Sequence, residues 1–135
     1  MKLTNNFSKH EFDCNDGSEM PSNVFYNVAK LAIQLQTLRS HIKKSITVNS
    51  GYRSPYYNDV VLPSKGIKTS KNSQHKLGKA ADIKVKGLSS SIVYGIIEDL
   101  ISKGEMLQGG LGLYNGFVHY DIRNSKARWD FRKKL

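Results

Sequence analysis

The chain has 135 residues, of which 39% are hydrophobic, so it is long enough for one folded domain and too apolar to be disordered. No apolar run approaches the roughly 20 residues of a membrane-spanning helix, and the opening "MKLTNNFSKHEF" lacks the apolar segment of a secretory signal, so we expect neither a membrane span nor a signal peptide. The formal net charge of +10 favours a polyanionic partner, either nucleic acid or the anionic bacterial cell wall.

The first predicted element is a long helix over residues 23–44, starting after Pro21. Its apolar residues recur at alternating spacings of four and three, which places them on one stripe: Val24, Val28, Leu31, Leu35, Leu38 and Ile42. Phe25, Ala32 and Ile33 widen this stripe, which favours packing against a core over a coiled coil.

Three reactive side chains near this helix receive no functional role. Cys14 is the single cysteine, so it predicts neither a disulfide nor a thiolate metal site, and we expect a structural thiol. For His10 and His41 we expect ordinary surface or hydrogen-bonding roles.

Two strands and a second helix follow. Residues 46–49 and 80–85 predict strands, separated by a polar, glycine-containing surface loop over residues 64–72. Residues 89–103 predict a helix with serines as N-cap candidates and Gly104 as a C-cap candidate. The expected buried face of this helix consists of Ile92, Val93, Ile96, Ile97, Leu100 and Ile101.

The last predicted element is a hairpin in "GGLGLYNGFVHYDIR". An Asn-Gly pair, Asn115-Gly116, lies between two runs of alternating apolar residues and predicts the turn. Helices mixed with a small, largely antiparallel sheet predict an α+β fold, with the sheet packed against two main helices. We expect a single domain over residues 1–135.

The predicted strands each carry potential ligands on one face, because side chains on a strand alternate between faces. One face of the strand 80–85 carries Ala81, Ile83 and Val85, and the other carries Ala80, Asp82 and Lys84. In the later strand one face carries Val118, Tyr120 and Ile122, and the other carries Phe117, His119 and Asp121. If both strands belong to one sheet, the polar faces converge, and Gly78 would let the chain bring His75 back over Asp82.

Two imidazoles and one carboxylate suit zinc, with the fourth position open to water. Zinc in such a site lowers the pKa of that water to about 7 and polarises a carbonyl group, which is the chemistry of peptide hydrolysis. Spacing alone leaves open the alternative that these histidines are surface or hydrogen-bonding residues.

The same stretches resemble the zinc peptidases of the M15 family, the D-alanyl-D-alanine carboxypeptidase-like enzymes that cut peptidoglycan stem peptides. "SQHKLGKAAD" fits their SxHxxGxAxD signature, "FVHYDIR" looks like their closing zinc-histidine strand, and "SGYRSPYYN" resembles the segment before the first ligand. "FSKHEF", "GGLGLY" and the pair Arg128-Trp129 resemble a small single-domain branch found in phage lysins and bacterial murein hydrolases. The resemblance covers nearly the whole chain and implies a hedgehog/DD-peptidase-like fold with a zinc site on the sheet face.

The resemblance also implies roles for individual residues. His75, Asp82 and His119 are implied as ligands of one zinc ion. Arg53 matches an arginine near the metal that holds the substrate or the developing oxyanion. Ser73 and Tyr114 are expected to contact the substrate, and the alternative for Ser73 is a loop hydroxyl that bonds the backbone.

One departure from the family concerns the general base. Several M15 branches carry an acidic residue three positions before the last zinc histidine, where this chain has Gly116. Asp121 is the nearest alternative, and it could either take a proton from the water or orient His119 or Arg53. Glu105 and a carboxylate of the substrate are further candidates for the base.

The sequence therefore predicts a zinc peptidase that cuts a stem peptide or a cross-link of peptidoglycan, as a phage or prophage endolysin. We expect a monomer that is made in the cytoplasm and reaches the wall after release, or that is carried in the virion. No nucleic-acid partner is expected, because no nucleic-acid-binding motif accompanies the lysines. The alternative, favoured by Gly116, is a weakly active or inactive wall-binding module of the same fold.

Overall fold

The centre of the fold is a five-stranded sheet in the order β1-β2-β4-β3-β5. The computed structural model describes residues 1–133, so residues 134–135 of the predicted domain lie outside the described residues. The strands are β1 (Ile46–Ser50), β2 (Ala80–Val85), β3 (Gly110–Leu113), β4 (Val118–Asp121) and β5 (Ala127–Asp130). Neighbouring strands are antiparallel, except that β5 runs parallel to β3. The predicted α+β class and the predicted hairpin are confirmed.

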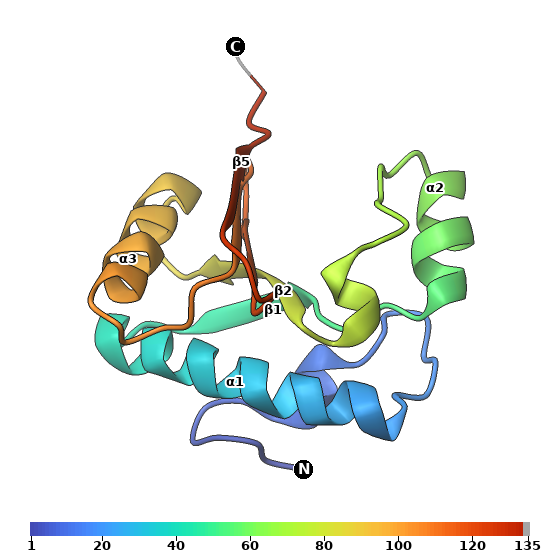
Figure 1. The fold of residues 1–135 in the computed structure, drawn as a ribbon, viewed down its shortest axis with the longest axis horizontal. Coiled ribbons are helices and arrows are strands. Elements are labelled where there is room, and N and C mark those ends of the chain that lie inside the picture. The colour runs from blue at the N-terminus through green and yellow to red at the C-terminus, as the bar shows by residue number, and fades with distance from the viewer. Residues whose placement is uncertain (134–135) are drawn as a thin grey trace.

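Helical segments surround this sheet. They are η1 (Lys9–Phe12), α1 (Ser22–Ile42), η2 (Tyr57–Val61), which continues into α2 (Leu62–Ser64), η3 (Gln74–Leu77) and α3 (Ser90–Ser102). In Figure 1, β1 and β2 run above α1, and the twisted sheet brings β5 upright, with α3 on one side and η3, in yellow-green, on the other. None of the helices in residues 1–133 combines the length and apolar character required to cross a membrane.

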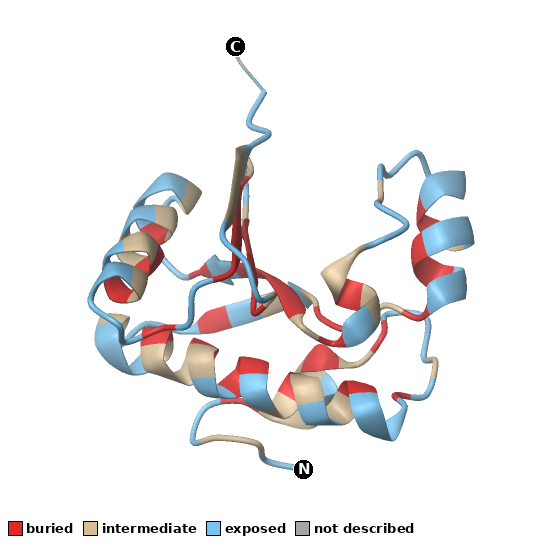
Figure 2. Cartoon of the chain, in the orientation of Figure 1, coloured by how far each residue is buried: buried red, intermediate tan, exposed pale blue. Residues whose placement is uncertain are grey.

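The apolar stripe of α1 packs on the core as predicted. Its buried residues are Val24, Val28, Leu31, Ala32, Leu35 and Leu38, and they appear as the red bands of α1 in Figure 2. The prediction for Ile33 is wrong, because its side chain is 57% exposed. One residue after Ala32 is a rotation of about 100° around the helix, which carries Ile33 off the buried stripe.

The second helix, α3, buries a narrower face than the sequence predicts. Ser89 caps it as predicted, since its hydroxyl accepts a hydrogen bond from the N–H of Ile92. Only Val93, Ile97 and Leu100 are buried. Ile92 is 52% exposed, so its predicted burial is wrong.

The fifth strand was not predicted from the sequence. Arg128 fixes it, because its guanidinium donates to both carboxylate oxygens of Glu98 on α3, at 2.9 and 3.0 Å, and to the carbonyl oxygen of Gly109 at 2.7 Å. The strand is short and polar, and its partner β3 lies earlier in the chain, so no local pattern marks it.

The two faces of the sheet divide as the alternation predicts. Ala81 and Ile83 of β2 and Val118 and Tyr120 of β4 are fully buried in the core, to which α1 and α3 contribute. α3 contacts β2, β3 and β4. The opposite face of β2 and β4 carries the polar side chains of the candidate site.

Candidate metal centre

Three potential metal ligands meet on the polar face of the sheet. Asp82 of β2 lies directly opposite His119 of β4, and η3 brings His75 over both. Oδ1 of Asp82 lies 3.3 Å from Nε2 of His75 and 3.1 Å from Nδ1 of His119. One ligand atom from each residue lies within 4.8 Å of the other two. All three residues are buried, so their polar atoms require partners in the protein or a bound ion.

The loop around η3 determines the position and the tautomer of His75. The hydroxyl of Ser73 accepts the backbone N–H of His75 at 3.2 Å, and Gly78 ends the segment with a φ of 74°. A Cβ at Gly78 would lie 2.7 Å from the carbonyl oxygen of Val24, so only glycine allows this close approach to α1. Nδ1 of His75 lies 2.8 Å from the carbonyl oxygen of Gly51, to which it can only donate. Its Nε2 lone pair therefore points towards Asp82, and burial lowers the pKa of His75, which favours the neutral ligand form.

Arg53 holds the second oxygen of Asp82. Its Nη2 donates to Asp82 Oδ2 at 3.2 Å, its Nε donates to Ser50 Oγ at 3.0 Å, and its Nη1 donates to Asn58 Oδ1 at 3.4 Å. Burial alone would raise the pKa of Asp82, but His75 and His119 hold it well below its usual range. Asp82 is therefore ionised, with Oδ2 engaged by Arg53 and Oδ1 turned to the two imidazoles.

Asp121 lies behind His119, on the side of the ring away from Asp82. Its Oδ2 is 2.7 Å from Nε2 of His119, whereas Nδ1 of the same ring faces Asp82. The guanidinium of Arg123 donates two hydrogen bonds to the Asp121 carboxylate, at 2.9 and 2.7 Å, and its backbone N–H donates a third at 3.1 Å. The N–H of Gly110 donates a fourth at 2.9 Å. Burial alone would raise the pKa of Asp121, but His119 and Arg123 hold it well below its usual range. This geometry favours the orienting role of Asp121 over the role of general base.

Glycine in β3 makes room for that carboxylate. A Cβ at Gly110 would lie 2.7 Å from Cγ of Asp121, closer than real side chains approach. Gly110 is paired with Asp121 across the sheet, so its missing side chain leaves the space that the carboxylate fills.

The donor set fits zinc. Each candidate ligand has its remote atom held by the protein: His75 by Gly51, His119 by Asp121, and Asp82 by Arg53. Their near atoms face one another, which orients two nitrogens and one oxygen towards a common centre, a donor set that zinc would accept. Burial alone would lower the pKa of His119, but Asp121 and Asp82 raise it, so a proton on this ring competes with a metal.

The other predicted site residues have local contacts that the structure defines. Ser73 caps η3 through its hydroxyl, which is the backbone-bonding alternative for this residue. Tyr114 is partly buried, and its hydroxyl accepts a hydrogen bond from Trp129 Nε1 at 2.9 Å. Gly116 lies in the exposed β3–β4 turn, where a Cβ would meet Lys84 at 3.9 Å, and Glu105 is exposed between α3 and β3.

Two contributors to the site were missed by the sequence reasoning. Arg123 follows Asp121 by two residues, a spacing that could have identified it as the partner of that carboxylate. Asn58 is fully buried and bonds Arg53, but it lies on η2, for which the sequence offers no clear signal. His10 and His41 are exposed, as expected, and Cys14 is buried with 4% exposure.

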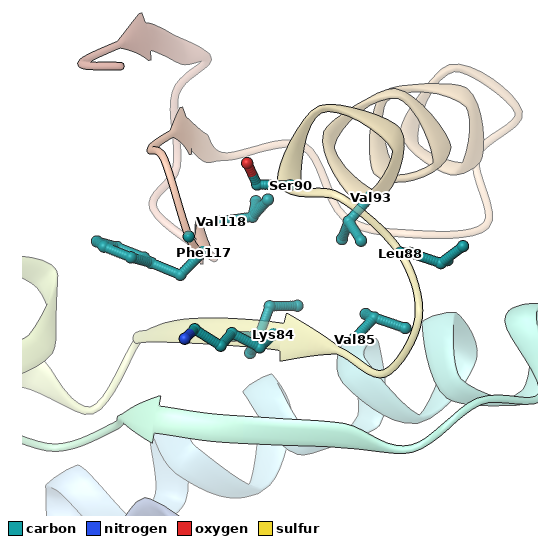
Figure 3. A pocket seen from close by; sticks show the side chains of 9 residues that line it. Lys84, Val85, Leu88, Ser90, Val93, Phe117 and Val118 are labelled. Atoms are coloured by element: carbon teal, nitrogen blue, oxygen red, sulfur yellow. The ribbon is translucent and has the colours of Figure 1, made fainter. Parts of the chain in front are cut away.

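A small cavity of about 130 Å³ lies elsewhere in the fold, and none of the ligand candidates lines it. Figure 3 shows it between the end of β2, the start of α3 and the residues after the β3–β4 turn, with Lys84 and Phe117 among its lining side chains. Its size is roughly that of a cavity that accepts one benzene molecule. It can therefore take one small group but not a peptide.

Comparison with known proteins gives one family. Residues 4–121 match the family model described as Peptidase M15, which includes His75, Asp82 and His119 and ends before β5. No curated protein matches the chain.

Proposed function

The chain belongs to the peptidase M15 family, and from this premise we propose that it is a zinc-dependent peptidase that cuts a peptide bond of bacterial peptidoglycan. The observation that carries the proposal is the buried group of two histidines and one aspartate, whose ligand atoms converge within 4.8 Å. The net charge of +10 supports a substrate in the anionic cell wall.

In the proposed mechanism His75, Asp82 and His119 hold the zinc ion. When bound in a site with an open position, zinc lowers the pKa of a coordinated water and polarises a carbonyl group. Asp121 keeps the His119 ring in its orientation. Arg53 steadies Asp82 and uses three of its five N–H donors on protein acceptors, which leaves two for an oxygen of the substrate.

The proposed setting is a phage or prophage lytic protein that acts as a monomer on the wall. The resemblance of "FSKHEF" and "GGLGLY" to the small single-domain branch supports this setting. Both a stem-peptide bond and a cross-link bond fit the same chemistry.

Zymography on purified walls tests the function. We expect clearing of a peptidoglycan gel that is abolished by a chelator and restored by zinc, and mass spectrometry of the released muropeptides will identify the bond. Clearing that persists after complete removal of metal would contradict a zinc peptidase.

A second candidate is a wall-binding module of the same fold. Gly116, at the position where several family branches carry an acidic base, favours it. Sedimentation with insoluble walls, without release of muropeptides by the zinc-loaded protein, would support the binding module instead of the enzyme.

A further inference from the structure

A row of aromatic side chains lies next to the metal centre on the same face of the sheet. The cross-strand register places Asp82, His119 and Gly112 side by side in β2, β4 and β3. A second row, two residues away from the first, consists of Lys84, Phe117 and Tyr114. The N–H of Tyr114 donates to the carbonyl oxygen of Phe117 at 3.2 Å. Because two residues of a strand span about 7 Å, this second row borders the site where a substrate would lie.

Trp129 connects this second row to the ligand His119. The indole lies over Gly112 and fills the space that a Cβ at this position would occupy. Its ring centroid is 5.0 Å from that of His119, and its Nε1–H donates to the Tyr114 hydroxyl at 2.9 Å. The Tyr114 hydroxyl is thus separated from a ligand imidazole by the width of one indole.

The aromatic neighbours fix the Tyr114 ring. Phe117 stacks on it with centroids 4.3 Å apart and an angle of 11°, and Phe131 meets it edge-on at 5.7 Å. The ring therefore has little room to move.

The bond from Trp129 determines what the Tyr114 hydroxyl can do. An indole N–H only donates, so the phenol oxygen must be the acceptor, and its own proton remains available for another partner. Within residues 1–133 the Tyr114 hydroxyl donates to no protein acceptor. A phenol held as an acceptor on one side is a hydrogen-bond donor for a ligand on the other.

We propose that Tyr114 is a catalytic residue that donates a hydrogen bond to an oxygen of the substrate peptide group, and that Trp129 is the positioning residue that holds it in the donating orientation. The inference rests on the proposed peptidase function. A donor at this place gains strength as negative charge develops on the carbonyl oxygen. Burial raises the pKa of Tyr114, so the hydroxyl keeps its proton at neutral pH.

The test compares zinc-loaded Tyr114→Phe, Trp129→Phe and the double variant with the unmodified protein on muropeptides from purified walls. We expect Tyr114→Phe to lower kcat about 100-fold with little change in KM, and Trp129→Phe to lower kcat about tenfold. In the double variant the loss of Trp129 should add nothing, because the hydroxyl that it positions is already absent. Tyr94→Phe on α3 is the matched control and should leave kcat unchanged.

An additive loss in the double variant would overturn the positioning role of Trp129, and unchanged kcat in Tyr114→Phe would overturn the role of Tyr114. Zinc content and circular dichroism on the same preparations identify variants that fail to fold.

A second measurement does not depend on the natural substrate. Acetohydroxamate offers a carbonyl oxygen to a zinc site, and its affinity for the zinc-loaded protein can be measured by calorimetry. We expect Tyr114→Phe to weaken it about tenfold. A protein that cuts no wall peptide but shows this weakening would refute the proposed function and retain only Tyr114 as a hydrogen-bond donor to a carbonyl ligand, whereas equal affinities would refute the inference.

Discussion

His119 and Asp121 form a 2.7 Å contact between Nε2 of the imidazole and Oδ2 of a carboxylate that is fully buried. The contact uses the nitrogen that points away from Asp82, so the carboxylate orients the ring from behind. Orientation by a carboxylate is a common property of metal-binding histidines, and it makes the ligand more basic.

The Asp121→Asn variant separates this orienting role from the role of general base. His119 and Arg123 Nη2 donate to Oδ2, whereas the N–H of Gly110 and Arg123 Nε donate to Oδ1. An amide has one accepting oxygen, so the donors at one of these two positions lose their acceptor. We expect zinc affinity to fall by about 10- to 100-fold and stability to fall by about 1–3 kcal/mol. Competition with a chelator and thermal unfolding measure the two effects.

Asp99→Asn provides the control for this change, because Asp99 pairs with Lys103 at an exposed position on α3. It should alter neither zinc affinity nor hydrolysis. Full zinc affinity in Asp121→Asn together with a loss of hydrolysis would restore Asp121 as the base.

Gly110→Ala tests the space for Asp121 without changing any charge. The added Cβ would collide with the Asp121 carboxylate, which would have to turn away from His119. We expect a lower melting temperature and a zinc affinity reduced about tenfold. Gly95→Ala is the matched control, because no atom lies within 4 Å of its Cβ and the helix should gain about 0.5–1 kcal/mol. Equal zinc affinity in both alanine variants would contradict the role assigned to this space.

His75→Ala should abolish stoichiometric zinc binding and hydrolysis together. It removes one of the three converging ligands, and two remaining ligands hold zinc far more weakly. His41→Ala, at an exposed position near the end of α1, should retain both properties. Atomic absorption on dialysed protein measures the metal, and a zinc-free His41 variant would show that the site has been misassigned.

Arg53→Lys should impair turnover more than it impairs metal binding. A single ammonium group cannot reach Asp82, Ser50 and Asn58 together, nor present two parallel donors to a substrate oxygen. We expect kcat to fall about tenfold or more and zinc affinity to fall less. Arg39→Lys on α1 is the control, and unchanged kinetics in the Arg53 variant would reduce Arg53 to a structural residue.

Metal removal should destabilise the protein and change its fluorescence. Zinc binds a site formed only in the folded chain, so an excess of 100 Kd adds about 2.7 kcal/mol, or roughly 8 °C in melting temperature. Trp129 is the single tryptophan, and its ring lies 5.0 Å from that of His119, so its emission should report zinc release. A chelator that changes neither the melting temperature nor the emission would argue against a bound metal.

The sequence by itself determined the two main helices, four of the five strands and the set of candidate ligands. The spacing of apolar residues predicts α1, and the alternation along β2 and β4 places Asp82 and His119 on the face away from the core. These features are local, because a helical stripe and a strand face depend only on residues a few positions apart. The signature around His75 could be read for the same reason.

Only the tertiary structure decided which atoms of these residues face one another. The register between strands decides which nitrogen of His119 faces Asp121. It also decides that Asp121 is buried against Gly110 and that Trp129 lies over Gly112. That register joins residues distant in the chain, and the parallel pairing of β5 with β3 leaves no periodic trace in either strand. The candidate ligands could therefore be predicted from short patterns, whereas the residues that support them were visible only once the strands were aligned.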